Sequence, residues 1–374
     1  MRGARRFGYS DVVTGSRPPI IVCVVIKGVI LTMPLRDRNP HMLCRIWFQV
    51  TIAISLLLTA ANGIGSTMVS PASAASLDKP SLVEAMKKTV VFIKTTCLEF
   101  DGNGNQVPKS YSGTAFLLGI ADSRLNGGLF TYLVTNRHMA QPGIEKGNLC
   151  QQPTYDLRVD TRVPNRAGSY SMVEQVPLAW TFPADPSVDL AIAPIGIDQN
   201  KLSVMFLPST LLMSNTDVTH NKVEEGDSVL FTGLFVQMVG QTHSEPIVRE
   251  GKIAMIPKER IPTTLGTIGD IYLVDCHVFG GNSGSPMFIN LAGQREGGLI
   301  VGINYKLLGI VSGYEIESEN FELQTVASYA GTVDANSGIA TVVPAQKILD
   351  LLDAPALKAS REKAISSLTK KQLH

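Results

Sequence analysis

The stretch Gly280-Gly281-Asn282-Ser283-Gly284-Ser285-Pro286 joins two runs of strand-forming residues. A serine flanked by glycines can be presented on a tight turn, because glycine adopts backbone conformations that other residues avoid. On such a turn, the N–H groups of Gly281 and Ser283 can point into one concavity and stabilise an oxyanion. An ordinary glycine-rich β-turn is the alternative, so a nucleophilic serine is predicted only if partner residues stand elsewhere in the chain.

Short runs rich in β-branched and aromatic residues recur on both sides of this stretch, separated by Gly, Pro, Asn and Asp. Long amphipathic helices between them are missing, which predicts an all-β barrel or sandwich and disfavours a doubly wound α/β fold. The strands are expected at Thr89–Phe100, Gly113–Gly119, Leu129–Thr135, Tyr155–Val159, Ser171–Val176, Leu190–Ile195, Ser228–Thr232, Val248–Met255, Ile271–Val274, Pro286–Ile289, Leu299–Tyr305 and Gly338–Val343.

Helices are expected only at the two ends of this β-rich region. Ser81 can cap a short helix over Leu82–Lys88. After Pro344, apolar residues recur at helical spacing and predict a C-terminal α-helix. Beyond Pro355 the chain is rich in Lys, Ala and Ser, which fits either a frayed helix or a solvated end.

A serine hydroxyl is a weak nucleophile and needs a base, for which histidine is suited. His138 ends the strand-like run Leu133–Thr135, where a loop-borne catalytic residue is expected. Asp189 opens the apolar run Leu190–Ile195, where burial would make it a strong acceptor that orients the histidine. Taken singly, each has a plainer interpretation, a surface histidine and a turn aspartate.

The order His138, Asp189, Ser283 resembles that of the chymotrypsin-like (trypsin-like) serine peptidases. The contexts TNRH, SVDLAIAPI and GNSGSP are similar to those of bacterial exported trypsin-like members, the group that includes the Deg-type proteases. The resemblance covers roughly Val90–Leu352 and implies two six-stranded antiparallel β-barrels with a catalytic triad in the cleft between them.

By this resemblance, Ser283 attacks a peptide carbonyl, His138 transfers the proton and Asp189 holds the imidazole tautomer. Gly281 and Ser283 supply the oxyanion-hole N–H groups. The expected function is therefore a serine endopeptidase that acts through an acyl-enzyme intermediate, without a cofactor.

Two departures from the family pattern carry predictions. The residue before the serine is the neutral Asn282, where digestive members have an aspartate that pairs with a newly cut N-terminus. We therefore expect activity without a buried N-terminus. Deg-type proteases carry a PDZ domain after the protease, and we expect none here, because only 31 residues follow Val343.

Substrate-binding residues are expected at two places. His277 stands six residues before Ser283, where the floor of the primary pocket usually lies in this family. It could select acidic or polar side chains, or it could be a hydrogen-bonded core histidine. Gly302, Ile303 and Asn304 are expected on an edge strand that pairs with substrate backbone.

Residues 46 to 60 form an apolar run that follows three arginines and precedes Ala72-Ser73-Ala74, a small-x-small cleavage signal. We interpret this as a secretory signal peptide, so the chain is expected to be exported, periplasmic or secreted. The alternative is an uncleaved membrane anchor, which would be the chain's only membrane contact. Translation is expected to start at Met33 or Met42.

The remaining cysteines after cleavage are Cys97, Cys150 and Cys276. Export permits a disulfide, for which Cys97 and Cys150 are the favoured pair because both lie on the His138 side of the chain. No CxxC or HxxxH spacing suggests bound metal.

The chain has 374 residues, 44% apolar content and a formal net charge of +1, so it can bury a large core and shows no charge pattern for nucleic acid.

These observations divide the chain as follows: 1–74 N-terminal extension and signal peptide, 75–205 N-terminal barrel, 206–222 linker, 223–343 C-terminal barrel, 344–374 C-terminal helix and tail. Protein or peptide is the expected partner, with the oligomeric state open. One alternative function is a catalytically silent protease-fold binding or scaffolding protein. An esterase or lipase is disfavoured, because its acid and histidine follow the serine in an α/β fold.

Overall fold

A computed structural model of the chain describes residues 20–26, 29–35, 80–100, 103–144, 150–295, 298–324 and 328–372. The chain divides into two units, Met1–Leu77 and Asp78–His374. In the first unit, β1 (Ile20–Ile26) and β2 (Val29–Leu35) pair as an antiparallel hairpin, which the sequence analysis did not predict. The expected signal segment lies outside the described residues.

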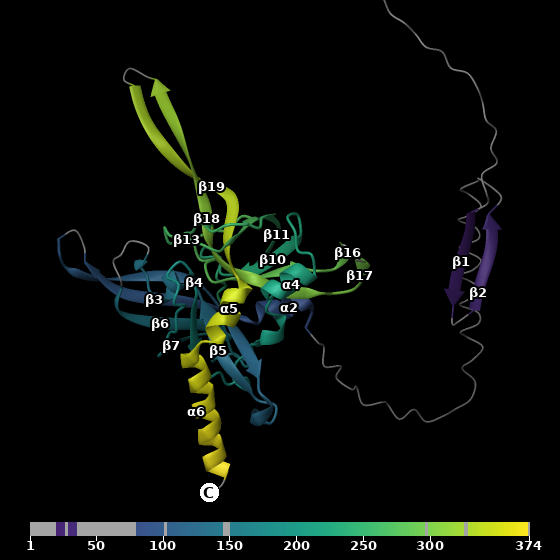
Figure 1. Ribbon diagram of the computed structural model, residues 1–374, viewed down its shortest axis with the longest axis horizontal. Helices are drawn as coiled ribbons and strands as arrows, with labels where there is room; N and C mark the ends of the chain where they lie inside the picture. The colour runs from purple at the N-terminus through teal and green to yellow at the C-terminus, as the bar shows by residue number, and fades with distance from the viewer. Residues whose placement is uncertain are drawn as a thin grey trace, which may run out of the picture. The chain divides into compact units, whose positions relative to one another are not determined.

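The second unit is built of strands, with helices mainly at its ends (Figure 1). Its strands are β3 Val90–Phe100, β4 Gln106–Ala121, β5 Leu129–Thr135, β6 Gln151–Asp160, β7 Ser171–Val176, β8 Ala191–Pro194, β9 Leu207–Pro208, β10 Ser228–Gly233, β11 Ile247–Met255, β12 Ile261–Pro262, β13 Ile268–Gly269, β14 Tyr272–Asp275, β15 Pro286–Asn290, β16 Gly293–Arg295, β17 Gly298–Ile300, β18 Tyr305–Gln324 and β19 Ser328–Pro344. Its α-helices are α2 Leu82–Lys87, α3 Arg137–Ala140, α4 Asn215–His220, α5 Ala345–Leu352 and α6 Pro355–Gln372.

The strands form two main sheets. Strands β10, β11, β14, β19, β18 and β15 close into an antiparallel barrel. The first sheet runs in the order β7-β6-β3-β4-β5-β8, and β9 adds a short parallel pairing to β4. The expected all-β fold class with C-terminal helix is confirmed, and the arrangement is consistent with a chymotrypsin-like double barrel.

The first sheet has two apolar faces, because successive side chains of a strand point to opposite sides. On β4, Leu117 packs with Ile93 and Leu133 inside the first sheet, whereas Phe116 and Leu118 belong to the larger core shared with the closed barrel. All five are buried. Burial of each such side chain contributes about 2 kcal/mol, so both faces hold the sheet in place.

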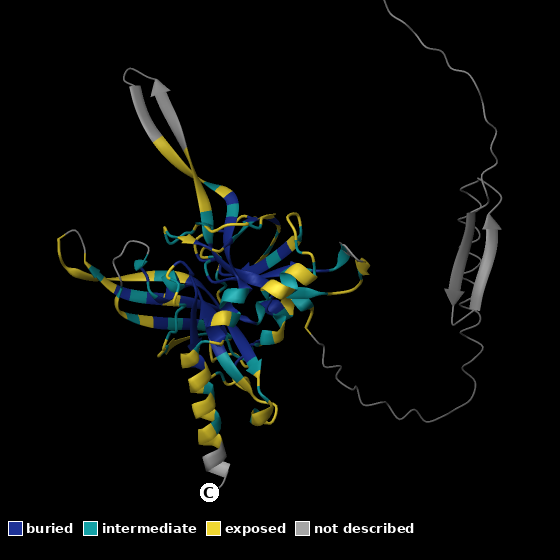
Figure 2. Cartoon of the chain, in the orientation of Figure 1, coloured by how far each residue is buried: buried dark blue, intermediate teal, exposed yellow. Residues whose placement is uncertain are grey.

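The C-terminal part is more helical than expected. Helix α5 has the predicted apolar stripe, with Ile348 and Leu352 buried in the large core. Helix α6 begins at Pro355 and is largely exposed along its described length (Figure 2). Of the two alternatives for this tail, the helix is therefore correct. Among the described residues, no helix is both long and apolar enough to cross a membrane.

Candidate active site

His138 lies in the single helical turn α3, directly after β5. Asn136 starts this turn and is fully buried, and its side-chain amide donates to the backbone carbonyl of Asp189 over 2.9 Å. The buried asparagine thus ties the end of β5 to the segment that carries the acid. The side chain of His138 keeps 23% of its surface exposed, as a residue that meets substrate requires.

Asp189 is 1% exposed and receives three hydrogen bonds. Its Oδ2 lies 2.7 Å from His138 Nδ1 and 2.5 Å from the donating Oγ of Ser312, and its Oδ1 accepts from the His138 backbone N–H over 3.0 Å. Burial alone would raise the pKa of Asp189, but the charge of His138 and the hydrogen bonds outweigh it and lower the pKa below its ordinary value. An ionised carboxylate only accepts, so Nδ1 of His138 carries a proton.

Ser283 stands on the turn between β14 and β15, and two of its glycines have conformations that exclude other residues. Gly281 has φ +98° and Gly284 has φ +88°. A Cβ on Gly284 would lie 1.9 Å from the backbone oxygen of Thr114, and one on Gly281 would lie 2.5 Å from Val236. The turn therefore packs against the first sheet only because these positions are glycine.

The Ser283 hydroxyl donates to the backbone carbonyl of Ser312 over 3.4 Å. Since the Ser312 side chain also bonds Asp189, one residue connects the serine with the aspartate–histidine pair. The backbone N–H groups of Gly281 and Ser283 have no hydrogen-bond partner within the part of the chain that the structure describes. Such groups can donate to an oxyanion.

Asn282 holds the shape of this turn from inside. It is fully buried, its side-chain oxygen accepts from the N–H of Phe279 over 2.8 Å, and its amide donates to the carbonyl of Leu234 over 2.6 Å. A neutral amide thus bridges the serine turn and the end of β10. No charged partner is needed for this contact, because both groups that it bonds are backbone amides.

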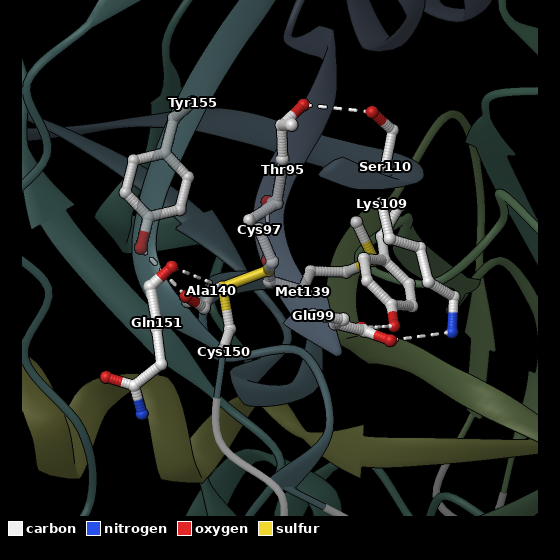
Figure 3. Close-up of a disulfide and its surroundings, with 12 residues drawn as sticks. Thr95, Cys97, Glu99, Lys109, Ser110, Met139, Ala140, Cys150, Gln151 and Tyr155 are labelled. Atoms are coloured by element: carbon white, nitrogen blue, oxygen red, sulfur yellow. Dashed lines mark hydrogen bonds and ion pairs between the residues drawn. A yellow bond between two sulfur atoms is a disulfide. The ribbon is translucent and has the colours of Figure 1, made fainter. Parts of the chain in front are cut away.

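The Cys97–Cys150 disulfide braces the histidine side of the site (Figure 3). The Cα atoms lie 5.4 Å apart, and the favoured pairing is the one that the structure contains. Two further contacts converge on the residues after His138. Thr95 donates to the carbonyl of Met139 over 2.7 Å. The Tyr155 hydroxyl donates to the carbonyl of Ala140 over 2.8 Å (Figure 3).

Cys276 is buried and free, and burial raises the pKa of its thiol to about 11. Its Sγ donates to the carbonyl of Glu250. A thiol with this pKa stays protonated at neutral pH and is a poor nucleophile.

The expected edge strand over Leu299–Tyr305 is wrong. β17 ends at Ile300, and Gly302, Ile303 and Asn304 form a connection to β18 with Gly302 at φ +98° and Ile303 78% exposed. This positive φ breaks the extended conformation that the β-branched run predicted. Among the described residues, no hydrogen bond joins these three residues to Asp189, His138 or Ser312.

The strand segment beside Ser283 lies further along, at Ser312, Gly313 and Tyr314. β18 pairs with β15 only as far as Ile310, whereas its pairing with β19 continues past Tyr314 to Gln324. In the described residues, the side of β18 that faces away from β19 therefore has no strand partner from Ser312 onward. A substrate could pair there by β-augmentation. The sequence signal that could have found it is the Ser-Gly pair that follows the apolar run Leu307–Val311.

His277 is exposed and lies beside Gly338 of β19. A Cβ on Gly338, whose φ is +82°, would lie 3.2 Å from His277 Cε1. The neighbouring Asn336 donates to the carbonyl of Val278 and so links β19 to the segment that carries His277. His277 is therefore not a core histidine, and nothing in its contacts identifies a substrate side chain. The described residues contain no cluster of three or more His, Cys, Asp or Glu side chains that could hold a metal ion.

No protein-family model and no curated protein matches the chain. Among solved structures, the chain is similar to Deg5, with 18% identity, 62% of this chain and 82% of that chain covered, and a TM-score of 0.35. It is also similar to the HtrA-type protease AlgW with decapeptide, with 18% identity, 72% of this chain and 65% of that chain covered, and a TM-score of 0.40. A third match is an inactive serine-to-alanine mutant of Rv3671c from M. tuberculosis H37Rv, with 17% identity, coverage of 76% and 95%, and a TM-score of 0.36. At these TM-scores, the function has to be argued from this chain's own residues.

Proposed function

We propose that the chain is a serine endopeptidase with His138, Asp189 and Ser283 as its catalytic residues. The observation that carries the proposal is the pair of hydrogen bonds from His138 Nδ1 and Ser312 Oγ to one buried carboxylate oxygen of Asp189. A buried carboxylate that holds Nδ1 leaves Nε2 as the atom that can exchange a proton with the serine.

In the reaction, Ser283 Oγ bonds to the substrate carbonyl carbon while its proton passes to Nε2 of His138. The N–H groups of Gly281 and Ser283 stabilise the negative charge on the carbonyl oxygen, an effect worth about 3 kcal/mol for one such donor where it has been measured. His138 then gives the proton to the leaving amine, and the acyl group stays on Ser283. Water activated by the same histidine releases it and restores the serine.

Ser312, Gly313 and Tyr314 would pair with the substrate backbone, and His277 with Gly338 would border the pocket for the side chain before the scissile bond. The substrate is a protein or peptide. The apolar run and the small-x-small motif in residues 46–74 support export, so this substrate is expected outside the cytoplasm. The proposed domains keep the boundaries given above, with the site between 75–205 and 223–343.

The test is to label the full chain with a fluorophosphonate probe, beside the Ser283→Ala variant, and to digest casein with both. Labelling and cleavage that are lost together in the variant are expected. A folded chain that neither labels nor cleaves would contradict the proposal and favour the alternative of a protease-fold binding or scaffolding protein.

A further inference from the structure

Thr114 of β4 is fully buried and makes two hydrogen bonds to the serine turn and one to Leu234 after β10, although it belongs to the first sheet. Its backbone N–H donates to the carbonyl of Ser283 over 2.8 Å. Its hydroxyl donates to the carbonyl of Gly281 over 2.8 Å and accepts from the N–H of Leu234 over 2.9 Å.

These contacts are available because β4 pairs with β5 only from Phe116 onward. On the β5 side, the backbone of Thr114 is therefore outside the ladder. Its N–H reaches Ser283, and its carbonyl accepts from the Thr135 hydroxyl over 2.7 Å. At Thr114, the first sheet therefore offers a backbone N–H that bonds the serine turn.

The two carbonyls that Thr114 binds belong to Gly281 and Ser283, the two residues whose N–H groups remain without a partner among the described residues. Anchoring these two carbonyls fixes the backbone of Gly281 and Ser283 against the first sheet, and Gly281, at φ +98°, has no side chain that would hold this conformation by itself. The backbone segment that carries both donors of the proposed oxyanion hole is therefore held in place by one side chain and one backbone N–H of the other sheet.

We infer that Thr114 is a positioning residue, whose hydroxyl aligns the oxyanion-hole N–H of Gly281 and links it to the end of β10. This inference rests on the proposed function. Displacement of a catalytic group by about 1 Å can cost on the order of 100-fold in rate, so loss of this hydroxyl should act on the chemical step. Substrate binding along β18 does not use Thr114.

The experiment compares Thr114→Val with Thr114→Ser in the full chain, using a chromogenic peptide cleaved by the unsubstituted protein. Valine keeps the shape and removes the hydroxyl, whereas serine keeps it. Thr114→Val is expected to lower kcat by about 10- to 100-fold with KM within about 2-fold, and Thr114→Ser to stay within about 3-fold in both.

Thr89→Val is the matched control, because Thr89 is also buried and its hydroxyl also donates to a backbone carbonyl, that of Met86 over 2.7 Å. It should lower the melting temperature without changing kcat. An unchanged kcat in folded Thr114→Val, or a kcat that falls equally in Thr89→Val, would overturn the inference.

If Thr114→Val does not fold, Thr114→Cys replaces it, since a thiol is a weaker donor of similar size. A kcat lowered below that of Thr114→Ser supports the inference, and a kcat equal to it overturns the inference. If the unsubstituted chain neither labels nor cleaves, the proposed function itself fails and this inference fails with it. Turnover by the unsubstituted chain separates the two failures.

Discussion

The first sheet holds His138 and Asp189 through local contacts and a disulfide, whereas the closed barrel holds Ser283 through contacts that reach out of the barrel. Asn136, Thr95 and the Cys97–Cys150 bridge all belong to the first sheet. The serine turn depends instead on Thr114 of the first sheet and on its own Asn282. The acid–base half is therefore held mainly by its own sheet, with the Ser312 hydroxyl of β18 as one contact from the barrel, and the nucleophile half takes its shape only when both sheets are packed together.

The largest effect is expected from Asp189→Asn, which breaks the acid–base half. Asp189 accepts hydrogen bonds at both of its carboxylate oxygens, whereas an amide has a single oxygen and would turn its NH2 group toward one set of donors, so kcat should fall by about 10⁴-fold. Asp185→Asn is the control, since Asp185 is a more exposed acid four residues away that bonds Ser187 and Arg260. Equal kcat values in the two variants would remove Asp189 from the mechanism.

A smaller loss is expected from Asn282→Asp, which acts on the nucleophile half. The carboxylate cannot donate to the Leu234 carbonyl and would be buried facing it, so kcat should fall by about 100-fold while the His138–Asp189 pair is preserved. Asn221→Asp serves as the control, because Asn221 also donates to a backbone carbonyl, that of Asp217, far from the turn in sequence. Wild-type kcat in Asn282→Asp would contradict the role given to the amide.

The double variant Cys97→Ser, Cys150→Ser tests whether the nucleophile half keeps its function when a brace of the acid–base half is removed. The bridge closes a long loop, with a sequence separation of 53, so its loss should lower the free energy of unfolding by about 2–4 kcal/mol in urea titrations. Fluorophosphonate labelling of Ser283 should persist and kcat should fall less than about 10-fold. If a folded double variant no longer labels, the two halves are not separable.

The smallest effect concerns a contact remote from both halves. Asp217 caps α4 and bonds Lys306, and the side-chain hydrogen bond from Lys306 is the main reason that its pKa is lowered from 3.8 to about 2. A depressed carboxyl pKa stabilises the fold above pH 3.8, and this contribution is lost as the pH falls through about 2. Asp217→Asn should therefore cost about 1 kcal/mol of unfolding free energy at pH 7, after allowance for solvent screening, and only a small fraction of that near pH 2. Equal losses at both pH values would assign the effect to helix capping alone.

Elements with clear local patterns were predictable from the sequence. β5 and β7 have the predicted bounds, and Ser81 caps α2 as expected. β18 was placed too early because a β-branched run was given more weight than the positive φ that Gly302 adopts. Periodicity reports which residues can be extended, but a glycine ends a strand only where tertiary packing requires it.

The residues of the candidate site also divide into those with a recognisable local sequence and those without one. His138, Asp189 and Ser283 carry recognisable contexts, and the structure brings the first two together directly and the third through Ser312. Ser312 and Thr114 have ordinary local sequences. Their importance comes from hydrogen bonds between segments that are distant in sequence, 123 residues in one case and 167 in the other, which no local pattern reports.

The most direct test of the central claim is to trap the acyl-enzyme. The full chain would be mixed with an active-site ester titrant, quenched and mapped by peptide mass spectrometry, with His138→Ala treated in parallel. We expect one acyl group per chain, on Ser283, and none in His138→Ala. An adduct on another residue, or equal acylation of Ser283 without His138, would contradict it.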